Sequence, residues 1–424
     1  MIVRSFRLRQ DNIRQVKSLC TENCIAVIRP EKPVENLFRQ AVSRTIIGKK
    51  PATEEFKAIN AYFESLSDDP DYREKSARII SDVASYLSQA MYVLSDVSAV
   101  EDYVLAKCAR ALSEAVADSI GANVVDGTEL LICREENGIP AVEWNLSREQ
   151  IILRLKGVTR TVVPGGYGRL KTGYVVRLGR GGAHLMASLI AAALGAEKLE
   201  SFVEADGVQG LEAITYDEMA HFCADNASAI SPTALWPLRT ANIPVIIKNI
   251  HNPAFEGTRV SDQKGPDRGK LFTGVISDSS LSLITVYGTG LPGQIGMSSA
   301  IFSRLSGLGV NIRFISQTSS EYSISFAVRD EDTDKALGGL KGLFEGNPLL
   351  PMDDVLVQNR KAGTVTVFGD RMKNVPGVSA RIYDTLGNAG ISIIASAQGG
   401  EELSISMVLS EEDIPRAVEL LKSL

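Results

Sequence analysis

The C-terminal part of the chain contains an internal repeat. The segment SLITVYGTGLPG (282–293) is matched by TVTVFGDRMKNVPG (364–377), and EYSIS (321–325) is matched by ELSIS (402–406). Each copy has the pattern of a strand, a Pro-Gly turn, a helix, two strands and a second helix. Because a β-α-β-β-α-β unit of this size is ferredoxin-like, we predict two such units, over 272–345 and 346–424.

In the N-terminal part, strands alternate with long amphipathic helices. NCIAVIRP (23–30) has the apolar run of a buried strand that ends at a proline. Further strands are predicted in NVVDGTELLICR (123–134), KLESFVEADGV (198–208) and, as a parallel strand, NIPVIIKNI (242–250). Helical spacing predicts helices over 34–45, 54–66, 72–94, 101–121 and 183–194. This alternation indicates a three-layer α/β domain over 1–262, followed by a Gly-, Asp- and Lys-rich boundary at about 257–272.

The composition excludes several classes of function. The 424 residues carry 45 Lys and Arg against 51 Asp and Glu, a net charge of −6, with no basic cluster for nucleic acid. We expect no membrane segment, because no apolar run approaches roughly 18 residues and the N-terminal sequence lacks a signal peptide's apolar core. Five scattered cysteines indicate reduced thiols and a cytoplasmic location. No metal site is expected, because the three histidines are dispersed and Cys20 and Cys24 lack a second pair at zinc spacing.

Two glycine-rich loops are candidates for binding an anion. In LGRGGAHLMASLIAAALGA (178–196), Gly181 and Gly182 open a helix whose N-terminus favours negative charge, and the guanidinium of Arg180 matches a carboxylate. VVPGGYG (162–168) adds Gly165 and Gly168. The alternative, which the residues alone favour, is that both loops are tight structural turns and that Arg180 pairs with a nearby carboxylate.

The two loops, ITYDEM (214–219), IPVIIKNIHNPAFEGTRV (243–260) and both repeats together resemble the aspartokinase family. The resemblance implies an amino-acid-kinase fold, a carbamate-kinase-like three-layer sandwich, followed by two ACT domains. In that family the first ACT domain is inserted in the second, so 270–278 would contribute a strand to the second. The implied reaction moves the γ-phosphate of ATP to the β-carboxylate of aspartate.

This sequence departs from the family's phosphate-binding and substrate-binding motifs. The family's KFGGTSV has Ser5 at its lysine position, with Arg7 and Leu8 at its glycines. Those side chains close the space for backbone approach, although Arg4 or Arg7 could supply positive charge. The family's GRGGSD ends here in Ala183 and His184.

Three further departures affect the remaining motifs. Ala109 stands where the family has the acid that holds the substrate's amino group, while Arg110 is retained. The family's YTADPR is missing after Asp206–Val208, so we interpret Asp206 as a turn residue. The family's GAKVLHP stretch reads NASAISP (226–232) in this chain. Five losses in independent elements predict that the chain does not phosphorylate aspartate, because removing even one preorganised group costs roughly two or more powers of ten in rate. We therefore expect no cofactor, and ATP with Mg²⁺ only if the chain is a divergent kinase.

The resemblance also implies an amino-acid effector pocket in the ACT domains. Backbone groups at the glycine turn and helix N-terminus could take the effector's carboxylate, and polar side chains on the next strand its ammonium group. The candidate residues are Gly290, Gly293, Gln294, Ile295, Asn311, Ile312, Gln317 and Ser320. Arg313 stands where lysine-sensing relatives often carry an acid, which makes a cationic effector less favourable. The alternative is that both units serve only as dimerisation sheets.

These observations leave three interpretations of function. The first is a non-catalytic, amino-acid-sensing regulator in aspartate-family amino-acid metabolism, forming a homodimer through its ACT domains and acting on a true aspartokinase or another pathway enzyme. The second is a divergent but active amino-acid kinase. The third is a dimeric scaffold in which neither pocket binds a ligand.

Overall fold

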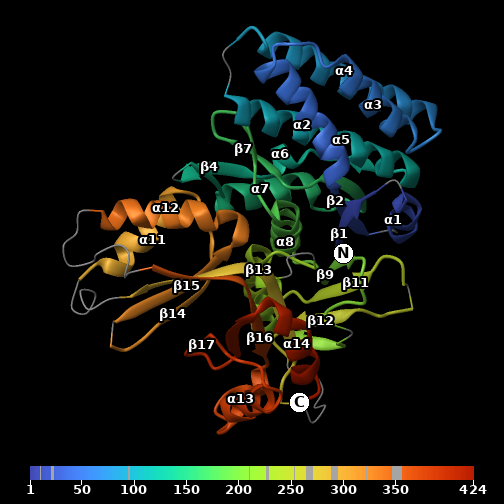
Figure 1. Ribbon diagram of the computed structural model, residues 1–424. Coiled ribbons are helices and arrows are strands. Elements are labelled where there is room, and N and C mark those ends of the chain that lie inside the picture. The colour runs from blue at the N-terminus through green and yellow to red at the C-terminus, as the bar shows by residue number, and fades with distance from the viewer. Residues whose placement is uncertain are drawn as a thin grey trace. The chain divides into compact units, whose positions relative to one another are not determined.

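The computed structural model of the chain divides into two compact units, Met1–Pro266 and Asp267–Leu424 (Figure 1). The structure describes residues 1–9, 11–20, 23–93, 96–136, 138–209, 211–225, 229–252, 254–263, 271–287, 295–320, 322–345 and 356–424.

An eight-stranded sheet forms the centre of the first unit. Its order is β10-β12-β11-β9-β1-β2-β6-β3, and every neighbouring pair is parallel except β11 with β12. The predicted parallel strand at 242–250 is confirmed as β11, beside β9. The strands are β1 (Ile2–Leu8), β2 (Cys24–Pro30), β3 (Asn123–Val124), β6 (Arg160–Pro164), β9 (Lys198–Val203), β10 (Ala213–Thr215), β11 (Val245–Asn249) and β12 (Thr258–Ser261).

Helices cover both faces of this sheet, as the alternating pattern predicts. Ala26 and Ile28 of β2 pack into a core with α5, whereas Val27 points to the opposite face, where α8 begins. Helices α2 to α5 gather at one side of the unit (Figure 1). The helices are α1 (Ile13–Leu19), α2 (Lys32–Val42), α3 (Thr53–Glu64), α4 (Pro70–Ala90), α5 (Val97–Ile120), α6 (Gly127–Leu130), α7 (Trp144–Leu155), α8 (Gly182–Leu194), α9 (Tyr216–Asp225) and α10 (Pro232–Thr240).

The predicted strand at 123–134 is wrong in its middle. The structure has β3, the short helix α6 and then β4 (Ile132–Glu136), because the Asp126 side chain accepts hydrogen bonds from the backbone N–H and the hydroxyl of Thr128 and so caps α6. β4 joins a four-stranded sheet of order β5-β4-β7-β8, with β5 (Ile139–Val142), β7 (Tyr167–Leu170) and β8 (Val175–Arg177).

The TYDE stretch that begins α9 has a structural role. The Glu218 carboxylate accepts from the backbone N–H of Thr215, and the Thr215 hydroxyl accepts from the backbone N–H of Glu218, which is a reciprocal capping box. Tyr216 donates a hydrogen bond from its hydroxyl to the carbonyl of Ile243. The Asp217 carboxylate accepts two hydrogen bonds from the guanidinium of Arg239. These contacts explain the motif by helix capping and packing.

The second unit has one antiparallel sheet of six strands, with the order β14-β15-β13-β16-β18-β17. The element order predicted for each repeat is confirmed, and the two copies share this sheet. The first copy has β13 (Gly274–Tyr287), α11 (Met297–Gly307), β14 (Ile312–Gln317), β15 (Ser323–Arg329) and α12 (Thr333–Phe344). The second has β16 (Leu356–Phe368), α13 (Val378–Asn388), β17 (Ala395–Gln398), β18 (Ser404–Ser410) and α14 (Ile414–Lys422).

Strand β13 serves both repeats. Residues 281–287 pair with β15, and residues 274–278 pair with the end of β16 beyond an irregularity in register. Phe272 and Val275 pack in the core under α13 and α14. The Ser316 hydroxyl of β14 donates to the carbonyl of Ser396 on β17 at 3.1 Å, so the two edges of the sheet touch.

Within the described ranges, no helix combines the length and the apolar character that crossing a membrane requires.

Candidate functional site

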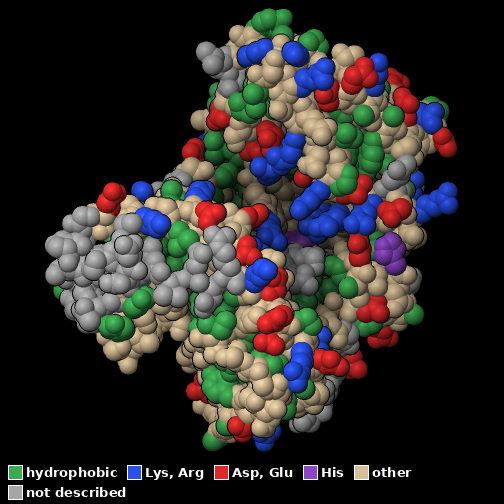
Figure 2. All heavy atoms as spheres, viewed as in Figure 1, with side chains coloured by type: hydrophobic (Ala, Val, Ile, Leu, Met, Phe, Trp, Pro, Cys, Tyr) green, Lys and Arg blue, Asp and Glu red, His purple; other side chains and the backbone are tan. Residues whose placement is uncertain are grey.

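A cavity of about 720 Å³ lies in the first unit, where β1, β2 and β6 end at their carboxyl edge. Ligands of open α/β sheets bind at such an edge. Figure 2 shows Lys and Arg side chains gathered around a hollow over this part of the unit. The described lining residues are Arg7, Arg29, Pro30, Lys32, Glu35, Gly165, Gly166, Tyr167, Arg177, Gly179, Arg180, Gly181, Gly182 and Ala183.

Arg7 and Arg29 are direct neighbours in the register of β1 and β2, so their side chains point to the same face. Both are half-buried, and neither side chain forms an ion pair or hydrogen bond with the rest of the chain as described. The Nε of Arg29 is buried without a hydrogen-bond partner. Burial and the neighbouring charge of Arg7 lower the pKa of Arg29 to about 10, which still leaves it cationic at neutral pH.

Two further cations at the cavity lack a partner among the described residues. Lys32 begins α2 and Arg180 lies in the second glycine loop; both are exposed and form no ion pair there. The guanidinium of Arg177, by contrast, lies 3.5 Å from the Asp102 carboxylate and 3.7 Å from that of Glu101. Among the described lining residues, Glu35 is the one carboxylate, and burial raises its pKa against the opposing effect of nearby arginines.

The glycine loops form the wall of the cavity beside α8. Gly181 has a φ of +83° and is the N-cap of α8, whose first turn holds no acidic residue and has no side-chain cap. A Cβ on Gly165 would lie 2.7 Å from Val27 and 2.9 Å from Ala183, and one on Gly168 would lie 2.7 Å from the Cys133 sulfur. Close packing therefore requires these glycines, while the open N-terminus of α8 favours an anion in the cavity.

A smaller cavity of about 230 Å³ shares Arg7 and Arg29 with the first. Its other described lining residues are Asn12, Phe202, Val203, Glu204, Ala205, Gly207, Phe222, Ala229 and Ile250. The two guanidinium groups thus lie where the cavities adjoin.

The residues at the departed motifs lie in the core or in structural contacts. Ser5 and Leu8 are buried in β1. His184 is fully buried with an unpartnered Nδ1, and burial, Arg29 and Arg7 hold its pKa well below the ordinary value, so it is neutral. Asp206 accepts hydrogen bonds from the side-chain amides of Asn249 and Asn252. Part of NASAISP, residues 226–228, lies outside the described residues.

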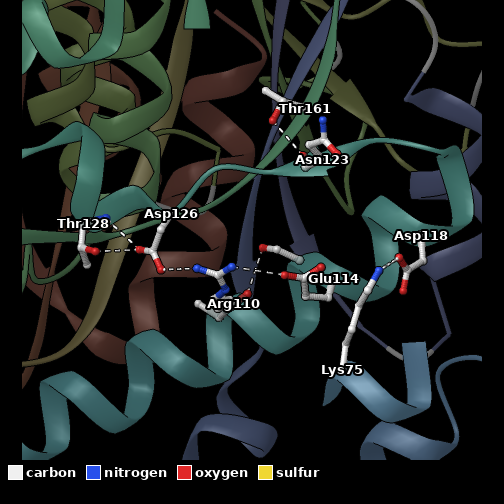
Figure 3. Close-up of polar contacts among 10 residues, drawn as sticks. Lys75, Arg110, Glu114, Asp118, Asn123, Asp126, Thr128 and Thr161 are labelled. Atoms are coloured by element: carbon white, nitrogen blue, oxygen red, sulfur yellow. Dashed lines mark hydrogen bonds and ion pairs between the residues drawn. The ribbon is translucent and has the colours of Figure 1, made fainter. Parts of the chain in front are cut away.

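Neither Ala109 nor Arg110 lines either of the two cavities described above. Ala109 is fully buried in the core of α5. Figure 3 shows the Arg110 side chain pointing to Asp126 and Glu114, with guanidinium-to-carboxylate distances of 3.0 Å and 3.6 Å. The arginine that matches the family motif is therefore engaged in structural ion pairs.

The structure describes only part of the predicted effector site. Gly290, Gly293 and Gln294 lie outside the described residues. Ile295, Asn311, Gln317 and Ser320 are exposed, whereas Ile312 packs against the first repeat's core. Arg313 does not act as an isolated positive charge, because its Nε and Nη2 lie 3.0 Å and 2.9 Å from the buried Asp278 carboxylate. Asp278 also pairs with Arg329, at 2.9 Å, so two guanidinium groups share one carboxylate, and the expectation that Arg313 disfavours a cationic effector stays a prediction.

Arg180 forms no ion pair with the described residues, so its pairing with a nearby carboxylate is not found. Sequence reasoning considered Arg7 but missed Arg29, Lys32 and Glu35. The sequence feature that could have pointed to them is the run of charged residues at the end of the buried strand in CIAVIRPEKPVE (24–35). Ligands of parallel sheets bind at this carboxyl end of the strands.

Comparison with known proteins agrees with this architecture. A model of the amino acid kinase family matches residues 56–249, and a model of the ACT domain matches 284–344 and 365–423. The bifunctional aspartokinase/homoserine dehydrogenase of Haemophilus influenzae is 34% identical over 266 residues, 59% of this chain and 32% of that protein. By these similarities the chain is related to aspartokinases. Aspartokinase 2 of Bacillus subtilis is 28% identical over 273 residues, 61% of this chain and 65% of that protein.

The fold of this aspartokinase homologue matches that of E. coli aspartokinase III along the full length. The crystal structure of that enzyme with lysine and aspartate has a TM-score of 0.81 at 18% identity, covering 100% of this chain and 99% of the other. The predicted fold class, an amino-acid-kinase domain followed by ACT domains, is thereby confirmed. The homologue spans about a third of the length of the bifunctional relative from Haemophilus influenzae.

Proposed function

We propose that this aspartokinase homologue is an amino-acid-sensing regulator in aspartate-family amino-acid metabolism and does not phosphorylate aspartate. The observation that carries the proposal is the state of Ala109 and Arg110. No carboxylate stands at the position that the family uses for the substrate's ammonium group, and the neighbouring arginine is engaged by Asp126 and Glu114. Without a counter-charge, an ammonium group buried there would be strongly destabilised.

The charges of the cavity support the same proposal. Magnesium ions prefer carboxylate and water oxygens, whereas Glu35 is the single described carboxylate in a lining that includes Arg7, Arg29, Lys32 and Arg180. The lining residues therefore do not fit a Mg²⁺ complex of ATP.

The ACT domains would supply the sensing. E. coli aspartokinase III has been crystallised with lysine, and the matched ACT domains make an amino acid the natural effector class here. Arg313 and Arg329 share the carboxylate of Asp278, so Arg313 does not by itself select among neutral, acidic and basic amino acids. We propose a homodimer through these domains, acting on an active aspartokinase or another enzyme of the pathway.

Two measurements test the proposal. Acyl-phosphate formation from ATP, Mg²⁺ and aspartate is expected to be absent, with Aspartokinase 2 of Bacillus subtilis assayed beside it as a control. A thermal-shift screen of the twenty amino acids is expected to raise the melting temperature with at least one of them, because a ligand of the native state stabilises it. Turnover of aspartate would establish the divergent kinase, and a flat screen would favour the scaffold.

A further inference from the structure

We propose that the cavity at β1, β2 and α8 binds a phosphate-bearing small molecule without Mg²⁺, through Arg7, Arg29, Lys32 and Arg180. This inference concerns the first unit alone. It does not depend on whether the ACT domains sense an amino acid.

The first argument is the pair of arginines. Like charges directly opposite each other on neighbouring strands destabilise a sheet. Arg7 and Arg29 occupy such positions, and no described carboxylate forms an ion pair with either side chain. An anion between them would relieve the repulsion and would also supply an acceptor to the buried Nε of Arg29.

The second argument is the placement of Lys32 and of the N-termini of α2 and α8. Lys32 lies in the first turn of α2, where the helix dipole disfavours a positive charge. Gly181, Gly182 and Ala183 bring the uncapped N-terminus of α8 to the same cavity. Both features become favourable when an anion occupies the cavity.

The third argument concerns the charge and size of the ligand. The described lining holds five cations, of which Arg177 pairs with Glu101 and Asp102 outside the lining. The other four cations and an ionised Glu35 leave an excess of three positive charges. A phosphate ester or a polyphosphate matches that excess more closely than a monocarboxylate does. The cavity of about 720 Å³ is of the size that small-molecule ligands occupy, and the adjoining cavity of about 230 Å³ offers Phe202, Phe222 and Ile250 to an apolar part.

The mode of binding differs from a glycine cradle. Arg7 stands where the family motif has glycine, so a side-chain fork takes the place of backbone N–H groups. A guanidinium binds phosphate oxygens through two parallel hydrogen bonds and needs no bridging cation.

The experiment is calorimetric titration of the full chain with inorganic pyrophosphate, with EDTA present and the ionic strength held constant. Wild type is expected to bind, and more weakly as salt is raised. Arg7→Gln, Arg29→Gln, Lys32→Gln and Arg180→Gln are each expected to weaken binding about tenfold or more. Arg148→Gln is the matched control, because Arg148 is exposed on α7 and does not line the cavity; it is expected to bind as wild type does.

Several outcomes would overturn the inference. They are the absence of pyrophosphate binding, binding by all four variants as tight as that of wild type, a strict requirement for Mg²⁺, or binding of succinate as tight as that of pyrophosphate. Lys32→Gln and Arg180→Gln change exposed side chains, so they keep the test decisive if a half-buried variant fails to fold. Acyl-phosphate formation from aspartate would contradict the proposed function, whereas only the EDTA titration bears on this inference.

Discussion

Arg4 on β1 and Glu200 on β9 form a buried ion pair, with 2.6 Å between Nε and the carboxylate oxygen. The side chains are 12% and 3% exposed. Lys198 and Lys248 also reach the second oxygen of Glu200, at 2.9 Å and 3.7 Å. The charge of Arg4 is thus compensated within the sheet, whereas that of Arg7, three residues along the same strand and on its other face, is not.

We predict that Glu200→Gln lowers the free energy of unfolding by about 3 kcal/mol, because it leaves Arg4 buried without its counter-charge. Denaturant unfolding measures the change. Lys57→Ala is the matched control: it breaks an ion pair whose side chains are 68% and 70% exposed, and its effect should stay below about 1 kcal/mol. Equal effects of the two substitutions would contradict the buried role of Glu200.

The pH dependence of stability should follow the same carboxylate. Burial opposes its ionisation, but Arg4 and Lys198 outweigh burial and hold the pKa of Glu200 below its ordinary value. Because the folded pKa is lower than the unfolded value of about 4.3, the stabilisation is present above that pH and is lost as the pH falls through the folded pKa. In thermal melts between pH 7 and 3, the melting temperature of Glu200→Gln should fall less at acid pH than that of wild type.

Gly181→Ala should destabilise the first unit more than Gly195→Ala. Both glycines have positive φ, +83° and +60°, so each substitution carries the left-handed strain of roughly 1–2 kcal/mol. A Cβ at Gly181 would also lie 2.3 Å from the Ser231 hydroxyl oxygen, whereas Gly195 has open space. Chemical denaturation compares them, and the double variant Gly181→Ala with Ser231→Gly should recover the difference. Failure to recover would show that the contact is not the cause.

Ala109→Glu, which places a carboxylate where the resemblance implies an acid, is expected to destabilise the protein by about 3 kcal/mol or more and to give no aspartate kinase activity. The new carboxylate would lie in the fully buried core of α5. Ala61→Glu, at an exposed position of α3, is the control and should change stability by less than about 0.5 kcal/mol. A stable, active Ala109→Glu variant would show that this position still faces a substrate.

Much of the architecture follows from local pattern. The repeat at 282–293 and 364–377 predicted two similar units, and helical spacing predicted α2 to α5 and α8 within a few residues. The error at 123–134 has a local cause as well, because capping by Asp126 starts a short helix inside an apolar run. Spacing of apolar residues reports which face is buried, but it does not report a side chain that caps a turn.

The candidate site required tertiary structure. Hydrophobic pattern alone does not set how β1 registers against β2, and that register is what places Arg7 opposite Arg29. The pairing of Arg110 with Asp126 and of Arg313 with Asp278 likewise joins residues 16 and 35 positions apart.

The sequence by itself determined the repeat and the helix-opening glycines at 181 and 182, and its differences from the family's motifs predicted a loss of kinase activity. Only the tertiary structure decided which charges are compensated. It shows Arg4, Arg110 and Arg313 held by carboxylates, and Arg7, Arg29, Lys32 and Arg180 at one cavity without one among the described residues. The physical reason is that helix and strand periodicity is a property of neighbouring residues, whereas the balance of charge in a cavity depends on segments that meet only after folding.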